Sequence, residues 1–302
     1  MRRQIAGSRI LITGASQGIG KALAEAAARR GGKVLAAARS LDLLKELQGE
    51  PGAVAGVSDP GHSTGVSDPG HNAGTLEIVQ ADVTNPEDRQ RMVQAALDHF
   101  GGIDILVNNA GIGATGHFVD AGPERLRQIF EVNFFGTTET IRAFLPLLKQ
   151  GNRPAIVNIS SIAGRRGIPA RSEYSASKFA VEGFSEALRP ELAKDGIDLI
   201  VVCPGLTQTN FSKNMIEQKA LLQFDHLRGM SSEAVAEATL RAIERGSTQV
   251  TLTFKGKLLV FISRFFPRLA DRIARRKVRS LFKDEIEARK AQSAQQGAPR
   301  AN

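Results

Sequence analysis

The chain has 302 residues, of which 42% are hydrophobic and 24% are charged, proportions that are ordinary for a soluble folded protein. They exclude collagen-like, coiled-coil and wholly disordered chains. A single cysteine, Cys203, excludes a disulfide scaffold and a thiolate zinc site. The five histidines include no close ligand pair, so we expect no metal.

The net charge of +9 is concentrated at one end of the chain. Residues 255–302 hold 13 Lys+Arg and 4 Asp+Glu, whereas residues 1–254 hold 27 of each. No apolar run approaches the roughly 20 residues that span a bilayer. The apolar run after Met1-Arg2-Arg3 breaks at Thr13-Gly14, which is too short for a signal peptide. These observations predict a cytoplasmic protein with a neutral body and a basic tail.

The first 250 residues alternate short β-branched runs with helical patterns. Strands are predicted at Arg9–Thr13, Lys33–Ala38, Leu76–Ala81, Ile103–Val107, Ala155–Ile159, Asp198–Cys203 and Gln249–Phe254. Helices are predicted at Lys21–Arg30, Leu41–Leu47, Pro86–Phe100, Pro123–Gln150, Ser172–Asp195 and Ser232–Arg245. Strands this apolar, alternating with helices, predict a doubly wound α/β fold with a parallel sheet and helices on both faces, in one domain over residues 1–254.

Residues 49–74 interrupt this alternation. The sequence GVSDPGH occurs at 56–62 and again at 65–71, and Asp-Pro-Gly is typical of turns. Two copies are too few for a solenoid. We therefore expect a flexible insertion; the alternative is that His62 and His71 bind a metal.

A glycine-rich segment, Thr13–Gly20, follows the first strand and opens the first helix. Its glycines permit a tight turn and a close approach to a pyrophosphate, and the helix N-terminus offers free N–H groups. The segment predicts a dinucleotide site at Gly14, Ser16, Gln17, Gly18, Ile19 and Gly20.

Four further segments follow in order. Asn108-Asn109-Ala110-Gly111 ends the fourth strand, and Asn133 lies in the long helical pattern. Ser161 comes just after the fifth strand. Tyr174, the only tyrosine, and Lys178 are four residues apart and share one helix face.

In type, order and spacing these segments, with Pro204-Gly205, resemble the short-chain dehydrogenase/reductase family over roughly residues 7–254. The matching motifs are TGASQGIG, NNAG, the Asn of VNFFG, the Ser of NISSIAG, and YSASK. Ser161 precedes Tyr174 by 13 residues, the usual family spacing, which favours Ser161 over Ser160. The resemblance implies a Rossmann fold, a nicotinamide cofactor, a small carbonyl or secondary-alcohol substrate, and a homo-oligomer, either a dimer or a tetramer.

The resemblance also implies a catalytic set of Asn133, Ser161, Tyr174 and Lys178. Tyr174 would be the general acid/base. Because an ordinary tyrosine has a pKa of about 10, a nearby Lys178 ammonium and the oxidised nicotinamide would have to lower it. Ser161 would hydrogen-bond the substrate oxygen, and Asn133 would hold a water linking Lys178 to solvent. The alternative for each residue singly is an ordinary helix pair or strand end.

The cofactor type is predicted from the end of the second strand. An acidic residue there typically binds the ribose 2′-hydroxyl of NAD, but this chain has Ala38, followed by Arg39 and Ser40. Arg39 suits a 2′-phosphate, and Ser40 would add a hydroxyl. The family's other common cation is replaced by Gln17. We expect NADP(H) to be favoured over NAD(H).

The remaining cofactor contacts are implied by the resemblance. Asp82 and Val83 would contact adenine, although Asp82 is alternatively a helix cap ahead of Asn85. Lys178 would also hold the nicotinamide ribose. The other predicted contacts are Asn109, Ala110, Gly111, Tyr174, Pro204, Gly205, Thr207 and Thr209.

Residues 210–230 correspond to the family's variable substrate loop. Its apolar residues are Phe211, Met215, Ile216, Leu221, Leu222, Phe224 and Leu227. An apolar loop suits a lipid, steroid, retinoid or long acyl chain. Alternatively, these residues pack the loop on the body.

The tail departs from the family core. Leu258, Ile262, Phe265, Leu269 and Ile273 recur at spacings of three to four, with cations between them. This pattern predicts a basic amphipathic helix over 255–282 that contacts a membrane surface, or packs on a partner subunit or over the substrate cleft. Nucleic acid is not expected, because the body is neutral and carries no recognition motif. Residues 291–302 are predicted to be disordered.

The sequence as a whole predicts an NADP(H)-dependent carbonyl reductase or alcohol dehydrogenase. The tail and the apolar loop are most similar to members that act on lipids, including ketosphinganine-type reductases. Two alternatives are a non-catalytic regulatory protein that senses NADPH and a membrane-tethered binding module. The complete catalytic set argues against the first.

Overall fold

The computed structural model describes residues 3–49, 74–209, 211, 215–217, 229–283 and 287. Residues 50–73 of the predicted insertion and the predicted disordered end, 291–302, lie outside this part of the chain. The chain divides into two compact units, Met1–Gly256, here called the body, and Lys257–Asn302, the tail unit. The domain bounds expected from the sequence, 1–254 and 255–302, stay a prediction.

The body is built on a seven-stranded sheet in the order β3-β2-β1-β4-β5-β6-β9, with every neighbouring pair parallel. The strands are β1 Arg9–Thr13, β2 Lys33–Ala38, β3 Thr75–Gln80, β4 Ile105–Asn108, β5 Ala155–Ile159, β6 Asp198–Cys203 and β9 Gln249–Thr251. A small second sheet pairs β7 Thr207–Gln208 with β8 Met230–Ser231. The predicted doubly wound parallel fold is confirmed.

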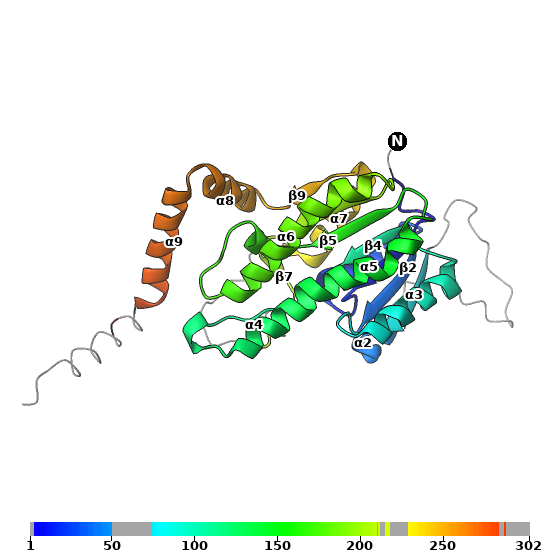
Figure 1. Ribbon diagram of the computed structural model, residues 1–302, viewed down its shortest axis with the longest axis horizontal. Coiled ribbons are helices and arrows are strands. Elements are labelled where there is room, and N and C mark those ends of the chain that lie inside the picture. Colours follow the sequence, from blue (N-terminus) through cyan, green and yellow to red (C-terminus); the bar gives the residue numbers. More distant parts are fainter. Residues whose placement is uncertain are drawn as a thin grey trace, which may run out of the picture. The chain divides into compact units, whose positions relative to one another are not determined.

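Helices cover both faces of the large sheet. One face carries α1 Gly18–Arg29, α2 Leu41–Gly49 and α7 Ser232–Arg245. The other carries α3 Pro86–Phe100, α5 Gly136–Leu148 and α6 Ser172–Ala193, which lie in front of the sheet in Figure 1. A short helix, α4 Pro123–Phe130, precedes α5. This burial on both faces explains why strands such as Ala155–Ile159 are apolar at nearly every position.

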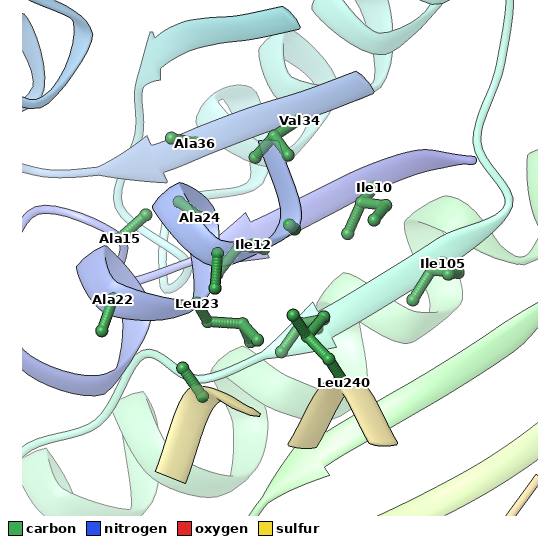
Figure 2. Close-up of a cluster of buried hydrophobic side chains, with 14 of the residues drawn as sticks. Ile10, Ile12, Ala15, Ala22, Leu23, Ala24, Val34, Ala36, Ile105 and Leu240 are labelled. Atoms are coloured by element: carbon green, nitrogen blue, oxygen red, sulfur yellow. The ribbon is translucent and has the colours of Figure 1, made fainter. Parts of the chain in front are cut away.

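The core under α1 is built from small side chains. Six alanines and leucines of α1 are buried, and α1 packs closely on α7. Figure 2 shows Leu23 of α1 and Leu240 of α7 among the side chains of the strands that carry Ile12 and Ile105. Both leucines are at most 1% exposed, so they fill the layer between helices and sheet.

Three predicted elements are corrected. The helical pattern predicted over Pro123–Gln150 is interrupted by a π-helical turn at Glu131–Phe135. The last strand ends at Thr251 instead of Phe254, because Phe254 begins helix α8 (Phe254–Phe265). The single helix expected in the tail is two, since Phe266 leaves the helical conformation and Pro267 opens α9 (Pro267–Leu281). A residue before proline is disfavoured in the helical region, which accounts for the break.

We predict that Leu240→Ala lowers the free energy of unfolding by about 2–5 kcal/mol, because it leaves a cavity between α7 and the sheet. Denaturant unfolding of the two proteins measures the difference. Leu43→Ala on α2, where the leucine is 37% exposed, is the control and should cost much less. Equal losses for both variants would contradict the packing described here.

Candidate active site

The candidate site lies at the carboxyl ends of the parallel strands. The chain moves outward in one direction from β1 to β2 and β3, and in the other from β4 to β5 and β6, so the strand order reverses between β1 and β4. Loops diverge at such a point and leave a crevice where ligands bind in this class of sheet. The predicted site segments that follow β1, β2, β4, β5 and β6 therefore all begin at the same edge of the sheet.

The glycine turn after β1 can be formed only by glycines at two of its positions. Gly14 has φ of +65° and Gly18 of +58°, which non-glycine residues rarely adopt. A Cβ atom on the buried Gly20 would lie 2.3 Å from the carbonyl oxygen of Gly14. Gln17 precedes α1 without a capping hydrogen bond from its side chain, and the first turn holds no acidic residue. The N-terminus of α1, with Ser16 and Ile19 half-buried beside it, therefore fits a pyrophosphate.

Asn109 holds this turn in place. Its side-chain amide donates to the carbonyl oxygens of Thr13 (2.9 Å) and Gly14 (3.1 Å). In return, Thr13 Oγ1 accepts from the backbone N–H groups of Asn109 (3.0 Å) and Ala110 (3.1 Å). The side chain of Asn109 thus joins the glycine turn to the loop after β4, while the predicted cofactor contacts of Asn109 and Ala110 stay a prediction.

A cation and a carboxylate stand at the ends of β2 and β3. Arg39 lies 4.0 Å from Asp82 and its side chain is 69% exposed, so the guanidinium is accessible. Asp82 Oδ1 accepts from the backbone N–H (2.9 Å) and the hydroxyl (2.8 Å) of Thr84. Asn85, and not Asp82, caps α3. Ser40 follows Arg39 and is half-buried.

Val83, after β3, and the residues after β6 are placed by close packing. A Cβ atom on Gly136 would lie 2.7 Å from Val83, so α5 packs tightly against it. The carbonyl oxygen of Pro204 accepts from the N–H of Ile162 at 2.9 Å. Thr209 reaches α1, because a Cβ atom on Gly18 would lie 3.2 Å from its methyl group.

Gly205 and Thr207, two further predicted cofactor contacts, lie just after Pro204 in the turn that follows β6. Thr207 Oγ1 donates to the carbonyl oxygen of Gly205 at 3.3 Å. A Cβ atom on Gly205 would lie 3.1 Å from Ile162. The turn after β6 is therefore held close to the loop after β5.

Asn133 is fully buried in the π-helical turn. Its Oδ1 accepts from the N–H of Ile112 (2.8 Å), and its Nδ2 donates to the carbonyl oxygen of Ile112 (2.9 Å) and to Ser177 Oγ (3.0 Å). Ser177 in turn donates to the carbonyl oxygen of Tyr174 at 2.8 Å. The extra residue of a π turn is what aims Asn133 inward, so this side chain connects the loop after β4 to α6.

Tyr174 and Lys178 lie on the buried face of α6, with Ser161 across from them after β5. Burial raises the pKa of Tyr174, while a hydrogen bond with Ser161 and the charge of Arg171 act in the opposite direction. Lys178 Nζ lies 5.9 Å from the centre of the Tyr174 ring. Tyr174 is therefore protonated near neutral pH and stands beside groups that favour its anion.

Lys178 is a buried cation held close to the same loop. Its Nζ donates to the carbonyl oxygen of Ile159 at 2.9 Å, and a Cβ atom on Gly111 would lie 3.6 Å from it. Burial lowers the pKa of Lys178 to about 8, and Glu182 opposes that shift. The ammonium form thus persists at neutral pH.

The two adjacent serines differ in their surroundings. Ser161 Oγ accepts from the N–H of Ala163 at 3.1 Å and pairs with Tyr174. Ser160 Oγ is buried beside Gly164 and has no hydrogen-bond partner among the described residues. Ser161 is thus the serine that pairs with Tyr174 among the described residues, while its catalytic role stays a prediction.

Sequence analysis missed a buried carboxylate one helical turn beyond Lys178. Glu182 is 7% exposed and accepts from Gln249 Nε2 at 2.6 Å, with the thiol of Cys203 3.1 Å away and Arg165 at 3.5 Å. Burial raises the pKa of Cys203, so it stays a thiol. The sequence did contain a signal for this carboxylate, because Glu182 follows Tyr174 and Lys178 at the same interval of four and therefore shares their helix face.

A second missed group is the buried cation Arg125 of α4. Its guanidinium binds Glu173, the residue before Tyr174, through three hydrogen bonds of 2.8–3.1 Å. It also pairs with Glu217 of the substrate loop. Arg125 therefore ties the described part of that loop to the start of α6. The sequence does not indicate that Arg125 is buried and paired, because its partners Glu173 and Glu217 are 48 and 92 residues away along the chain.

The described part of the substrate loop brings apolar groups to Tyr174. The ring centres of Phe211 and Tyr174 are 5.6 Å apart, and the N–H of Ile216 donates to the carbonyl oxygen of Gly113 at 2.9 Å. Met215 is half-buried. The other predicted loop residues, Leu221, Leu222, Phe224 and Leu227, lie outside the described residues.

Neither a metal centre nor a membrane span is found in the part of the chain that the structure describes. No group of three or more His, Cys, Asp or Glu side chains there could hold a metal ion. No described helix is both long enough and apolar enough to cross a bilayer.

The fold and this arrangement define a class of protein. The family model for short chain dehydrogenases matches residues 8–69 and 52–220, and the chain belongs to the short-chain dehydrogenase/reductase family. It is accordingly an oxidoreductase.

Known proteins of this kind are similar over most of the chain. An uncharacterized oxidoreductase YxnA of Bacillus subtilis (strain 168) is 34% identical over an alignment of 273 residues that covers 87% of this chain and 70% of that protein. A short chain dehydrogenase from Burkholderia cenocepacia J2315, solved in complex with NADP, is 30% identical with a TM-score of 0.70, covering 88% of this chain and 97% of that one. An enzyme from Burkholderia phymatum, solved in complex with NAD, is 24% identical with a TM-score of 0.73, covering 88% and 96%, and shows the fold alone.

We predict that Glu182→Gln moves the alkaline loss of activity to lower pH. With the catalytic role that the sequence predicts for the Lys178 ammonium, activity should fall as pH rises through its pKa of about 8, and removal of the Glu182 charge should lower that pKa further. The measurement is kcat/KM across neutral and alkaline pH. Glu186→Gln, an exposed glutamate one turn further along α6, is the control. Superimposable profiles for all three proteins would remove Glu182 from this account.

Proposed function

We propose that the protein transfers a hydride between NADP(H) and the carbonyl or secondary-alcohol carbon of an apolar, lipid-like small molecule. The observation that carries the proposal is the group of Tyr174, Ser161 and Lys178 at the carboxyl edge of the sheet. It joins a proton donor, a second hydroxyl and a buried cation beside the crevice where a dinucleotide fits. The bound nicotinamide supplies and accepts the hydride.

The protein's own residues handle the oxygen end of that reaction. In the reducing direction, Tyr174 gives its hydroxyl proton to the substrate oxygen as negative charge develops there. Ser161 donates a hydrogen bond to the same oxygen. The tyrosine anion that results is stabilised by the charges of Lys178 and Arg171. Asn133 keeps α6 in register with the loop after β4 through Ile112 and Ser177.

The preference for NADP(H) is supported by charge at the end of β2. Arg39 is exposed and follows Ala38, so a 2′-phosphate would meet a guanidinium instead of a carboxylate. Asp82 lies 4.0 Å from Arg39 and leaves that guanidinium largely exposed. A relative with 30% identity was solved with NADP, and a more distant one with NAD.

The apolar character of the substrate is supported by the described walls beside Tyr174. Phe211 packs against the Tyr174 ring, and Ile216 and Met215 follow in the same loop. Such walls favour an aliphatic or ring system over a sugar or a phosphorylated compound.

We also propose that the enzyme is a cytoplasmic homo-oligomer, a dimer or a tetramer. Phe135 and Phe179 are 48% and 45% exposed at the face formed by the start of α5 and by α6. Large exposed aromatic side chains on neighbouring helices are typical of subunit contacts.

A non-catalytic NADPH sensor is the competing function. It would need the glycine turn and Arg39 but neither the hydroxyl of Tyr174 nor the pairing of Ser161 with it. Turnover by the variants below separates the two.

We predict that Tyr174→Phe lowers kcat on the order of 10²-fold or more, because it removes the proton donor while keeping the ring. Carbonyl substrates from an apolar panel, followed by NADPH absorbance, give the rate, and fluorescence titration gives NADPH affinity, which should persist. Ser161→Ala should also lower kcat, and Ser160→Ala is the matched control that should not. Full turnover by the phenylalanine variant would disprove the role of Tyr174.

We predict that Arg39→Asp reverses the cofactor preference. The carboxylate repels the 2′-phosphate of NADPH and accepts a hydrogen bond from the ribose of NADH. Paired titrations with NADPH and NADH on wild type and variant measure the ratio of affinities. Lys45→Asp, an equal charge change at an exposed position of α2, is the control. If the ratio stays the same in Arg39→Asp, this arginine does not bind the phosphate.

A further inference from the structure

The tail unit combines a large positive charge with exposed apolar side chains. Its described part, residues 257–283, contains nine Lys+Arg and a single acidic residue, Asp271. The body over residues 1–254 is neutral. The unit therefore has a strong electrostatic preference for an anionic surface, independent of the site in the body.

Helix α9 separates its cations from its apolar residues. Arg268, Arg272 and Arg276 follow at intervals of four, and Arg275 and Arg279 fall between them on the same side. Leu269 and Ile273 lie four residues apart on an adjoining stripe, each one residue after an arginine of that side, and are 43% and 52% exposed. The helix is amphipathic, and two of its large apolar side chains, Leu269 and Ile273, are exposed, whereas Ala270 is buried.

Helix α8 adds aromatic side chains and three cations, Lys255, Lys257 and Arg264. Leu258, Phe261 and Phe265 share one face by their spacing and are 47%, 52% and 62% exposed. The rings of Phe261 and Phe265 are in contact, with centres 4.8 Å apart. Phe266, at the break before α9, is 54% exposed and lies 6.4 Å from Phe261. These rings form an apolar cluster next to the cations of α9 in the chain.

We infer that the tail unit binds the surface of an anionic lipid bilayer, with α8 and α9 lying in the plane of the interface. A lipid surface satisfies both chemistries at once, since headgroup phosphates meet the arginines and acyl chains receive the phenylalanines and leucines. A nucleic acid would pair with the arginines but leave the apolar residues in water. A protein groove would cover the apolar residues but needs a separate acidic rim.

Helix length favours a surface location over a spanning one. At 1.5 Å per residue, the 12-residue α8 is about 18 Å long and the 15-residue α9 about 22 Å, both shorter than a hydrocarbon core of roughly 30 Å. Only Leu252 and Thr253 separate β9 from α8, so binding of the tail also holds the enzyme body at the surface.

The inference is tested by flotation of the full-length protein with phosphatidylcholine vesicles, with and without phosphatidylglycerol. We expect binding to the anionic vesicles alone, weakened only in part by salt, because salt screens the charges but not the apolar burial. Arg272→Gln with Arg276→Gln should weaken binding on the order of 10-fold or more. Phe261→Ser with Phe265→Ser should lower the fraction of the protein that stays bound to the vesicles at high salt.

Controls make each outcome decisive. The control variant Arg29→Gln with Arg142→Gln removes two positive charges from exposed positions of the body and should leave vesicle binding unchanged. If it weakens vesicle binding as much as the tail variant does, binding depends on overall charge and the inference is overturned. Aggregation or a large drop in Tm of the serine variant before vesicles are added would mean that the cluster packs on protein, which also overturns it. A soluble wild type that never floats with anionic vesicles does the same. Tyr174→Phe should float as the wild type does, so a failed catalytic proposal leaves this result intact.

Discussion

The reversal of strand order between β1 and β4 is the constraint on which the rest of the site depends. Because all seven strands are parallel, their carboxyl ends share one edge, and residues separated by more than 150 positions meet there. Thr13 is the last residue of β1, and Asn109, Ser161 and Pro204 follow the ends of β4, β5 and β6. The hydrogen bonds of Asn109 with Thr13 and Gly14 then fix the glycine turn to the loop after β4.

Buried charge in the body is balanced close to the reacting groups. Removing an ammonium from water is costly, and Lys178 keeps its charge through the carbonyl oxygen of Ile159 and the carboxylate of Glu182. Glu182 is fixed in turn by Gln249 of the last strand. On the other side of Tyr174, Arg125 is paired with Glu173. Helix α6 is thus held by polar contacts from β9 at one point and from α4 at another.

Local patterns in the sequence predicted the strands, the glycine turn and the Tyr174–Lys178 pair, since each depends on residues within one turn or one strand. The π-helical turn at Asn133 was not predictable, because an inserted residue leaves the helical periodicity on either side intact. Glu182 and Arg125 were missed because their partners come from distant segments, and only the folded chain reveals which charges are buried together. In the tail, apolar spacing predicted one helix, and the conformational effect of Pro267 on Phe266 made it two.

The central claim is that Tyr174 exchanges its proton under the control of the bound nicotinamide and Lys178. The chain has one tyrosine and no tryptophan, so the ultraviolet absorbance of tyrosinate reports on Tyr174 alone. Titration of the protein without cofactor should give a pKa above the ordinary value, because the ring is buried. Addition of oxidised NADP should lower that pKa, since a second positive charge then faces the phenol. A tyrosinate transition at the same pH with and without the oxidised dinucleotide would contradict the account.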